Sequence, residues 1–175
     1  MSKINISKLK AARAQLDAAI EMYFVSDNPV ATHTLTSAAY NILRDIALKS
    51  GSDCPFLKTG YINEYPESKR KMIRNFLNRP ENFFKHADRD PNGTIEFDTE
   101  LTELFLLDAC AYFRDKKELR PKYYNIFKAW HGVPKKRTSN TQKLFVETMR
   151  DYFRSKGKLE YWRCVTQHLP KNKAD

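Results

Sequence analysis

The sequence predicts an all-α fold, a single-domain bundle of five to six helices. Apolar residues recur at three- and four-residue steps in several segments, helix-starting residues precede two of these segments, and the stretch around residue 105 is apolar over most of a helical circumference. With 175 residues and 41% hydrophobic side chains, the chain can close one core. This composition excludes wholesale disorder.

The first two helices are predicted over residues 6–24 and from Pro29 to Gly51. The second starts where Asn28 can cap the helix and Pro29 can take the first position, which needs no backbone N–H. A short turn between two amphipathic helices predicts that they pack antiparallel. The apolar stripe of the first helix is Ile6, Leu9, Ala12, Leu16, Ala19, Ile20, Tyr23 and Phe24.

A loop is predicted over residues 51–66, because this stretch holds two glycines and two prolines and has no lasting period. A third helix follows Pro66. Since Pro80 cannot donate a helical hydrogen bond, we expect it to kink this helix or to begin a fresh turn. The side chains expected to face inward are Ile73, Phe76, Leu77, Phe83, Phe84 and Ala87.

A fourth helix is predicted over residues 100–115, after an extended or strand-like segment at 94–97. Asp98 or Thr99 can cap it. Apolar side chains surround most of this helix, which predicts a central place in the bundle. Asp108 interrupts the apolar run, so we expect its carboxylate at a wet edge or beside a cation.

Residues 119–175 are predicted to form a basic, aromatic-rich helical extension, packed on the core of residues 1–118 as part of the same domain. A helix is expected over residues 139–155, and a last short helix over residues 159–169. Residues 132–137 form the best linker candidate, because they combine Gly, Pro and a run of cations.

Positive charge is concentrated at the C-terminal end of the chain. Residues 1–115 hold 15 Lys and Arg against 16 Asp and Glu, whereas residues 116–175 hold 16 against 5. Such a basic segment, interleaved with aromatic rings, favours a nucleic acid over a membrane as partner. A solvated basic surface without a ligand is the alternative.

The remaining composition predicts a cytoplasmic protein. Cys54, Cys110 and Cys164 lie too far apart in the sequence to indicate a disulfide framework or a zinc knuckle. No apolar run approaches the roughly 18 residues that span a membrane, and no apolar leader segment follows Met1. We therefore expect no membrane association, no metal and no cofactor.

The Asp-rich turn after the third helix has the first half of a calcium-binding loop. Asp88, Asp90 and Asn92 stand at the first, third and fifth positions, and Gly93 stands at the sixth. The twelfth position is Thr99, which cannot supply the bidentate carboxylate that closes such a loop. An ordinary turn is the preferred interpretation.

The end of the third helix carries a candidate ribonuclease site. Arg79, Asn82 and His86 are spaced to share one face of a helix. With Arg79 as phosphate clamp, His86 as base or acid and Asn82 as positioning group, such a site can cleave RNA at the ribose 2′-hydroxyl without a metal. The alternative is a helix-end histidine near a surface arginine.

The stretch RPENFFKH, from Arg79 to His86, resembles the Arg-x(4–6)-His motif of the HEPN superfamily of small all-α domains. The resemblance covers residues 5–118 and implies a HEPN-like core. In some members this core is a metal-independent endoribonuclease, commonly active as a homodimer, and in others it is not catalytic. The stretches HTLTSAAYNILRDI and NFFKHADRDP also resemble an uncharacterised group of bacterial proteins.

Two functions are therefore predicted. The first is an RNA-interacting domain with Arg79 and His86 at its centre, and the second is a non-catalytic helical protein that binds nucleic acid or an acidic partner protein. Where the partner is a single-stranded nucleic acid, cations are expected to follow its phosphates and aromatic rings can stack on its bases. The cations predicted to make these contacts are Lys85, Arg89, Lys116, Lys117, Arg120, Lys122, Lys135, Lys136, Arg137, Arg154, Lys156 and Lys158.

Overall fold

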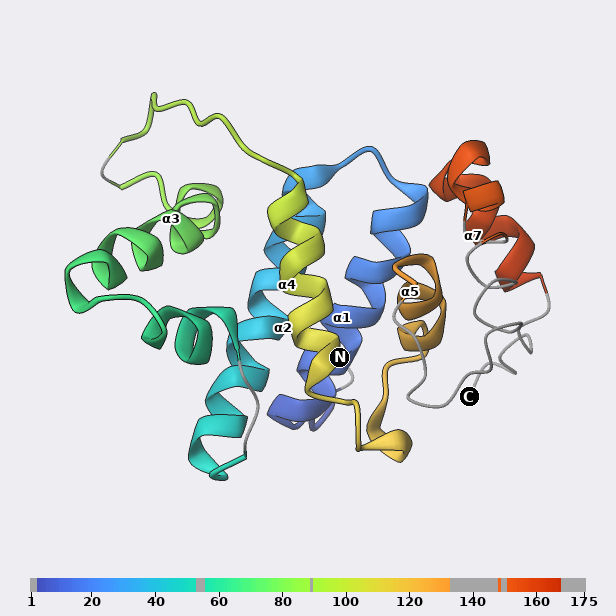
Figure 1. The fold of residues 1–175 in the computed structure, drawn as a ribbon, viewed down its shortest axis with the longest axis horizontal. Coiled ribbons are helices and arrows are strands. Elements are labelled where there is room, and N and C mark those ends of the chain that lie inside the picture. The colour runs from blue at the N-terminus through green and yellow to red at the C-terminus, as the bar shows by residue number, and fades with distance from the viewer. Residues whose placement is uncertain (1–2, 53–55, 89, 133–147, 149–150, 168–175) are drawn as a thin grey trace.

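The computed structural model confirms the all-α fold class. No strand occurs in the ranges that it describes, which are residues 3–52, 56–88, 90–132, 148 and 151–167. The chain forms a helical bundle whose core is built by α1 (Lys8–Val25), α2 (Pro29–Lys49) and α4 (Glu100–Ala111). Figure 1 shows α3 (Glu67–Lys85) on one side of this core, and α5 (Tyr124–Trp130) and α7 (Lys158–Thr166) on the other.

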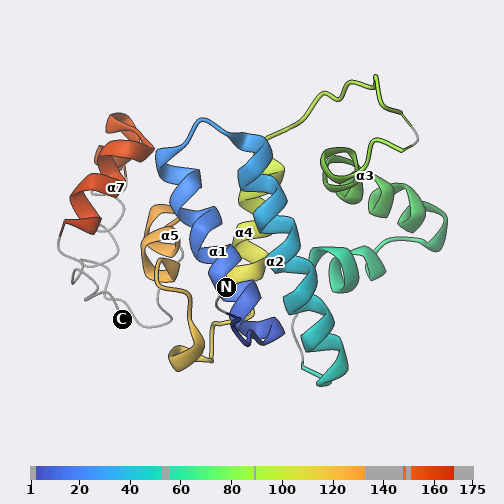
Figure 2. The same ribbon diagram turned by 180° about the vertical axis from the view of Figure 1, so that it is seen from behind.

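The helices α1 and α2 form the predicted antiparallel hairpin, which Figure 2 shows from behind. Ser7 caps α1, because its hydroxyl accepts a hydrogen bond from the Lys10 backbone N–H at 3.2 Å. Asn28 caps α2 as predicted, since its side-chain oxygen accepts from the Ala31 N–H at 3.0 Å, and Pro29 follows at the first helical position.

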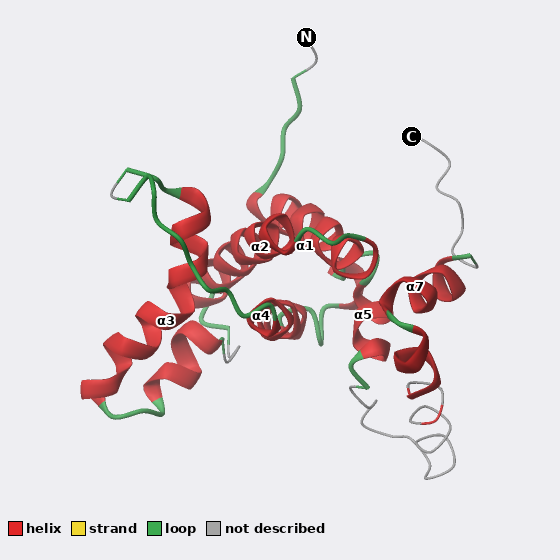
Figure 3. Ribbon diagram, turned by 90° about the horizontal axis from the view of Figure 1, so that it is seen from above, coloured by secondary structure: helices red, strands yellow, loops and turns green. Residues whose placement is uncertain are grey.

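The helix α4 covers one face of this hairpin, as the view from above shows (Figure 3). Of the two predicted caps, Asp98 makes the contact, with its Oδ1 accepting from the Glu100 N–H at 2.9 Å. The buried ring of Phe105 stacks on Tyr40 of α2 with ring centroids 4.9 Å apart. Leu104 stays half exposed, so one side of α4 faces solvent.

The predicted loop at 51–66 instead contains a π-helical turn, η1 (Leu57–Tyr61). Its first backbone N–H groups donate to side chains of the core, from Leu57 to Asp108 at 2.6 Å and from Lys58 to the Tyr40 hydroxyl at 2.9 Å. Local periodicity could not reveal this turn, because the groups that satisfy its backbone lie far away in the sequence.

The helix α3 begins after Pro66 as predicted and continues through Pro80, so of the two expected outcomes, a kink or a fresh turn, the fresh turn does not occur. It projects from the bundle and packs along one edge only (Figure 3). The prediction that Phe76, Phe83 and Ala87 face inward is therefore wrong, since all three are exposed. The side chains that do face the bundle are Ile73, Leu77, Pro80 and Phe84.

Aromatic rings pack α5 and α7 against α1. Phe24 stacks on Trp162 with centroids 5.4 Å apart, and Tyr23 meets Phe127 edge to face at 5.5 Å. Gly157, at φ 88°, allows the sharp turn that leads into α7. Of the helix predicted over residues 139–155, positions 151–155 are helical, and most of the rest lies outside the described residues.

None of the helices described combines the length and apolar composition that a bilayer crossing requires.

Candidate functional site

The predicted ribonuclease residues lie on the exposed side of α3. Arg79 and Asn82 face solvent within the helix, and His86 follows its last residue with an extended backbone. In the described part of the chain, no hydrogen bond or ion pair engages these three side chains. They are accessible and lie close in sequence, and their catalytic role stays a prediction.

Their neighbour Lys85, predicted to contact phosphate, is bound to Glu81 instead. Glu81 accepts from Lys85 Nζ and from Lys58 Nζ, each at 2.8 Å, and from the Asn41 amide at 2.6 Å. Burial alone would raise the pKa of Glu81, but the hydrogen bonds from the two lysines lower it to about 2. An ionised, buried carboxylate thus fastens α3 to α2 and η1.

His33 lies next to this network and is completely buried. Its Nδ1 is 3.0 Å from the Thr102 hydroxyl, and its ring stacks on Phe105 at 5.7 Å. Burial, reinforced by the positive charge of Lys58, lowers the pKa of His33 to about 4. The imidazole is therefore neutral at pH 7, and its structural surroundings are those of a core histidine.

Among the described residues no cation forms an ion pair with Asp108, so that expectation is wrong, and the carboxylate keeps partial access to solvent. Its half-buried carboxylate accepts the Leu57 N–H at 2.6 Å and a hydrogen bond from the Tyr40 hydroxyl. Burial raises the pKa of Asp108 to about 6, although these hydrogen bonds oppose the shift. The carboxylate positions the start of η1.

Pro91 and Asn92 of the Asp-rich segment form a turn, across which the Gly93 N–H donates to the Asp90 carbonyl oxygen at 3.2 Å. A β-carbon at Gly93 would lie 2.1 Å from Asp90 Oδ2, so the aspartate side chain folds back onto the glycine. Among the residues that the structure describes, no three His, Cys, Asp or Glu side chains gather closely enough to hold a metal ion.

A basic surface follows the connection from α4 to α5. We define it by Arg114, Lys116, Lys117, Arg120, Lys122 and Lys128. The guanidinium of Arg120 and the ammonium of Lys128 both lie over the Tyr124 ring, 4.8 and 5.3 Å from its centroid. Partial burial lowers the pKa of Lys128, and the charges of Arg114 and Arg120 lower it further. Within the described ranges, no carboxylate forms an ion pair with this surface.

The cations of this surface differ in whether their side chains donate hydrogen bonds to the protein backbone. Lys116 donates to the Tyr112 carbonyl oxygen at 3.0 Å, and Arg120 donates to the carbonyl oxygens of Phe113 and Arg114. Arg114 and Lys117 are exposed and make no such bond in the described part of the chain. Because Tyr112 and Tyr124 are buried, the surface offers charge rather than open rings.

The other predicted phosphate contacts differ in their surroundings. Arg154 and Lys156 are exposed, with Lys156 5.8 Å from the centroid of the Tyr152 ring. Lys158 is engaged by the carboxylate of Glu103. Four predicted contacts fall outside the described residues, namely Arg89, Lys135, Lys136 and Arg137.

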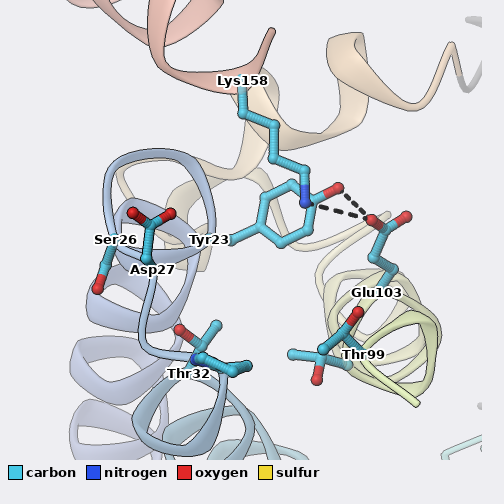
Figure 4. A pocket seen from close by; sticks show the side chains of 9 residues that line it. Tyr23, Ser26, Asp27, Thr32, Thr99, Glu103 and Lys158 are labelled. Carbon is cyan, nitrogen blue, oxygen red and sulfur yellow. Dashed lines mark hydrogen bonds and ion pairs between the residues drawn. The ribbon is translucent and has the colours of Figure 1, made fainter.

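A cavity of about 290 Å³ opens between the α1–α2 turn, the start of α4 and the start of α7 (Figure 4). Glu103 stands at its edge and accepts the Tyr23 hydroxyl at 2.5 Å, with Lys158 Nζ 3.5 Å from the same oxygen. Lys158 also lies over the Tyr23 ring, 3.6 Å from its centroid. The cavity is lined by Tyr23, Ser26, Asp27, Pro29, Thr32, Thr99, Thr102, Glu103 and Lys158.

The polar groups around Glu103 join four helices rather than form a reactive centre. Burial, and then the hydrogen bond to Glu103, raise the pKa of Tyr23 well above its ordinary value, so the phenol stays protonated. Trp130 donates to the same hydroxyl at 3.3 Å, and His131 Nδ1 lies 4.0 Å from Glu103. Sequence patterns missed this cluster, because Tyr23 fits the apolar stripe of α1.

Comparison with known proteins finds no relative, since no family model, no curated protein and no solved structure matches the chain.

Proposed function

We propose that this protein is an RNA-interacting helical domain that binds single-stranded nucleic acid, with the basic surface as its electrostatic contact. The observation that carries the proposal is the accumulation of cations that form no ion pair with a carboxylate in the described ranges, two of which lie over the Tyr124 ring. Burial lowers the pKa of Lys128, and the charges of Arg114 and Arg120 lower it further; a bound anion would relieve the repulsion among these cations. A phosphate chain is a suitable partner, because it supplies regularly spaced negative charge.

Salt-dependent binding tests this function. The anisotropy of a labelled single-stranded RNA is titrated with protein at several salt concentrations in EDTA. Arg114→Gln combined with Lys117→Gln should weaken binding and reduce the salt slope by about 0.7 for each phosphate that is no longer neutralised. The matched control is Lys3→Gln with Lys8→Gln, which removes the same charge from exposed positions at the other end of the sequence.

Two results would count against this function. If the wild-type protein does not bind RNA at low salt, the proposed contact does not exist. If the control pair weakens binding as much as the pair on the basic surface, binding follows the net charge of +10 rather than this surface. In the second case, an acidic protein should displace the RNA as well as an unlabelled RNA does, because only net charge would decide binding.

Metal-independent RNA cleavage is a second candidate, favoured by the exposure of Arg79, Asn82 and His86 and by the HEPN resemblance. Attack by the ribose 2′-hydroxyl would leave a cyclic phosphate on one product and a 5′-hydroxyl on the other. Cleavage in EDTA should therefore yield these ends, and His86→Ala and Arg79→Ala should each abolish it. Arg74→Ala is the matched control, since Arg74 is an exposed cation of the same helix.

A homodimer belongs to this second candidate, because the resemblance implies that two motifs act together. Sedimentation of the wild-type protein, with and without RNA, measures whether two copies associate. Intact RNA together with salt-dependent binding would favour the non-catalytic alternative.

A further inference from the structure

The helix α3 carries an exposed stripe in which cations alternate with apolar side chains. We define the exposed stripe by Lys69, Met72, Phe76, Arg79 and Phe83, which follow one another at steps of three and four residues and so share one face of the helix. Met72 is 64% exposed, Phe76 62% and Phe83 37%. The sequence pattern alone predicts both phenylalanines in the core.

A second apolar stripe of the same helix already serves the packing of α3. Leu77 and Pro80 are buried there, and Ile73 packs against the core cluster. The packing of α3 against the bundle therefore does not use the exposed stripe. Its large apolar side chains face water, which in a folded protein indicates an interaction surface.

The charges beside the stripe restrict the partner. Lys69 and Arg79 are exposed, and neither has a hydrogen bond or an ion pair to its side chain in the described ranges. Lys85, by contrast, is held by Glu81. A second copy of the chain would bring Lys69 and Arg79 toward the same cations of its partner, which is unfavourable. An anionic partner with flat apolar groups fits both the charge and the rings.

We infer that the exposed stripe binds unpaired bases, with Phe76 and Phe83 as stacking platforms and Lys69 and Arg79 as phosphate contacts. This inference rests on the proposed binding of single-stranded nucleic acid. The two phenylalanines are seven residues apart, about 10 Å along a helix axis, so they accept two different bases. Duplex bases are stacked on one another and cannot reach the rings, so the stripe selects single strands.

The stripe differs from the basic surface in what it can recognise. The rings of Tyr112 and Tyr124 in the basic surface are buried under cations, whereas Phe76 is mostly exposed and Phe83 is partly exposed. His86 follows Phe83 by three residues, at the end of the same helix. A strand bound on the stripe would therefore contact Arg79 and run toward His86.

The test compares single-stranded and duplex RNA of the same sequence, each titrated with protein in EDTA. Phe76→Ala combined with Phe83→Ala should weaken single-strand binding roughly tenfold for each ring, with the salt slope unchanged, because no charge is removed. Weak duplex binding should not change. Leu48→Ala combined with Leu104→Ala is the matched control, since both leucines are exposed apolar residues outside α3.

Failure of this inference can be told apart from failure of the proposed function. If wild-type protein binds no RNA, the proposed function itself is overturned. If it binds RNA and the phenylalanine pair behaves like the leucine pair, the stripe is not a stacking surface, although the basic surface can still bind. If the phenylalanine pair lowers the sedimenting mass and leaves RNA affinity unchanged, the stripe is an interface between copies. Capture of an acidic protein without a change in RNA affinity overturns the inference in the same way.

Discussion

Lys58 Nζ and Glu81 Oε2 lie 2.8 Å apart in a site where each residue is less than a tenth exposed. The pair joins η1 to α3 across 23 residues of sequence. A second lysine, Lys85, reaches the same carboxylate from the wet side of α3. One buried carboxylate therefore contributes, together with the apolar packing of Leu77 and Pro80, to the attachment of α3.

Removing the charge of Glu81 should strongly destabilise the protein. Glu81→Gln leaves the buried ammonium of Lys58 without a counter-charge, and such changes cost about 3–5 kcal/mol of unfolding free energy. Urea unfolding followed by circular dichroism measures the decrease. Replacing both partners, as in Lys58→Met with Glu81→Leu, should recover most of it, because no uncompensated charge remains. A double variant as unstable as Glu81→Gln would show that the pair itself supplies the stability.

The contact between Lys58 and Glu81 also shows which kind of interaction the sequence does not predict. The cap at Asn28 and the stripe of α1 are predictable because their signals are local. Glu81 and Lys85 stand four residues apart, which is a recognisable helical ion pair, but nothing in the sequence connects either residue to Lys58. The prediction for Phe76 is wrong because periodicity identifies apolar faces and does not say how many of them find a partner.

The candidate site is predictable to a similar extent. The positions of Arg79 and Asn82 on one helix follow from their spacing. The prediction that His86 shares this helix is wrong, because α3 ends at Lys85 and the backbone of His86 is extended. The basic surface follows from composition, but the burial of its rings does not, because burial of Tyr124 depends on packing between helices distant in sequence.

His33 should make stability fall as the solution is acidified. Its pKa is lowered from 6.5 to about 4 in the folded protein, so the unfolded chain binds the proton more readily. The contribution of the neutral imidazole is fully present above pH 6.5 and is lost as pH falls toward 4, by up to about 3 kcal/mol. His33→Gln should abolish this dependence in urea titrations at several pH values. An unchanged pH profile would contradict the assigned burial.

Asp108 should act in the opposite direction over nearly the same range. Its pKa is raised from 3.8 to about 6, so the folded state binds the proton more readily than the unfolded chain. Stability is therefore highest below pH 3.8 with respect to this group, and it falls by about 1–2 kcal/mol as pH rises through 6, after allowance for partial exposure. Asp108→Asn should remove this fall and become relatively more stable above pH 6. The His33→Gln variant should reveal the Asp108 dependence, which in the wild-type protein is masked.

Tyr23→Phe should loosen the attachment of α7. The hydroxyl donates to Glu103 at 2.5 Å and accepts from Trp130, so its removal leaves a carboxylate oxygen and an indole N–H with one partner fewer. We expect a decrease of about 1–3 kcal/mol in unfolding free energy. The substitution should also accelerate amide hydrogen exchange more in α7 than in α2. Tyr65→Phe is the control, because that hydroxyl is bonded only at the surface. Equal effects of the two changes would contradict the assigned role of Glu103.

Asn28→Ala should destabilise the hairpin by about 1 kcal/mol, because the Ala31 N–H at the start of α2 loses its acceptor. Asn28→Ser should retain most of the stability, since a serine hydroxyl can accept the same bond. The comparison separates capping from any general effect of removing an amide, and Asn63→Ala at an exposed position gives the baseline. The change should appear as a lower urea midpoint with an unchanged slope, because the surface exposed on unfolding stays the same. If Asn28→Ser is as unstable as Asn28→Ala, the amide of Asn28 acts through some interaction other than the cap.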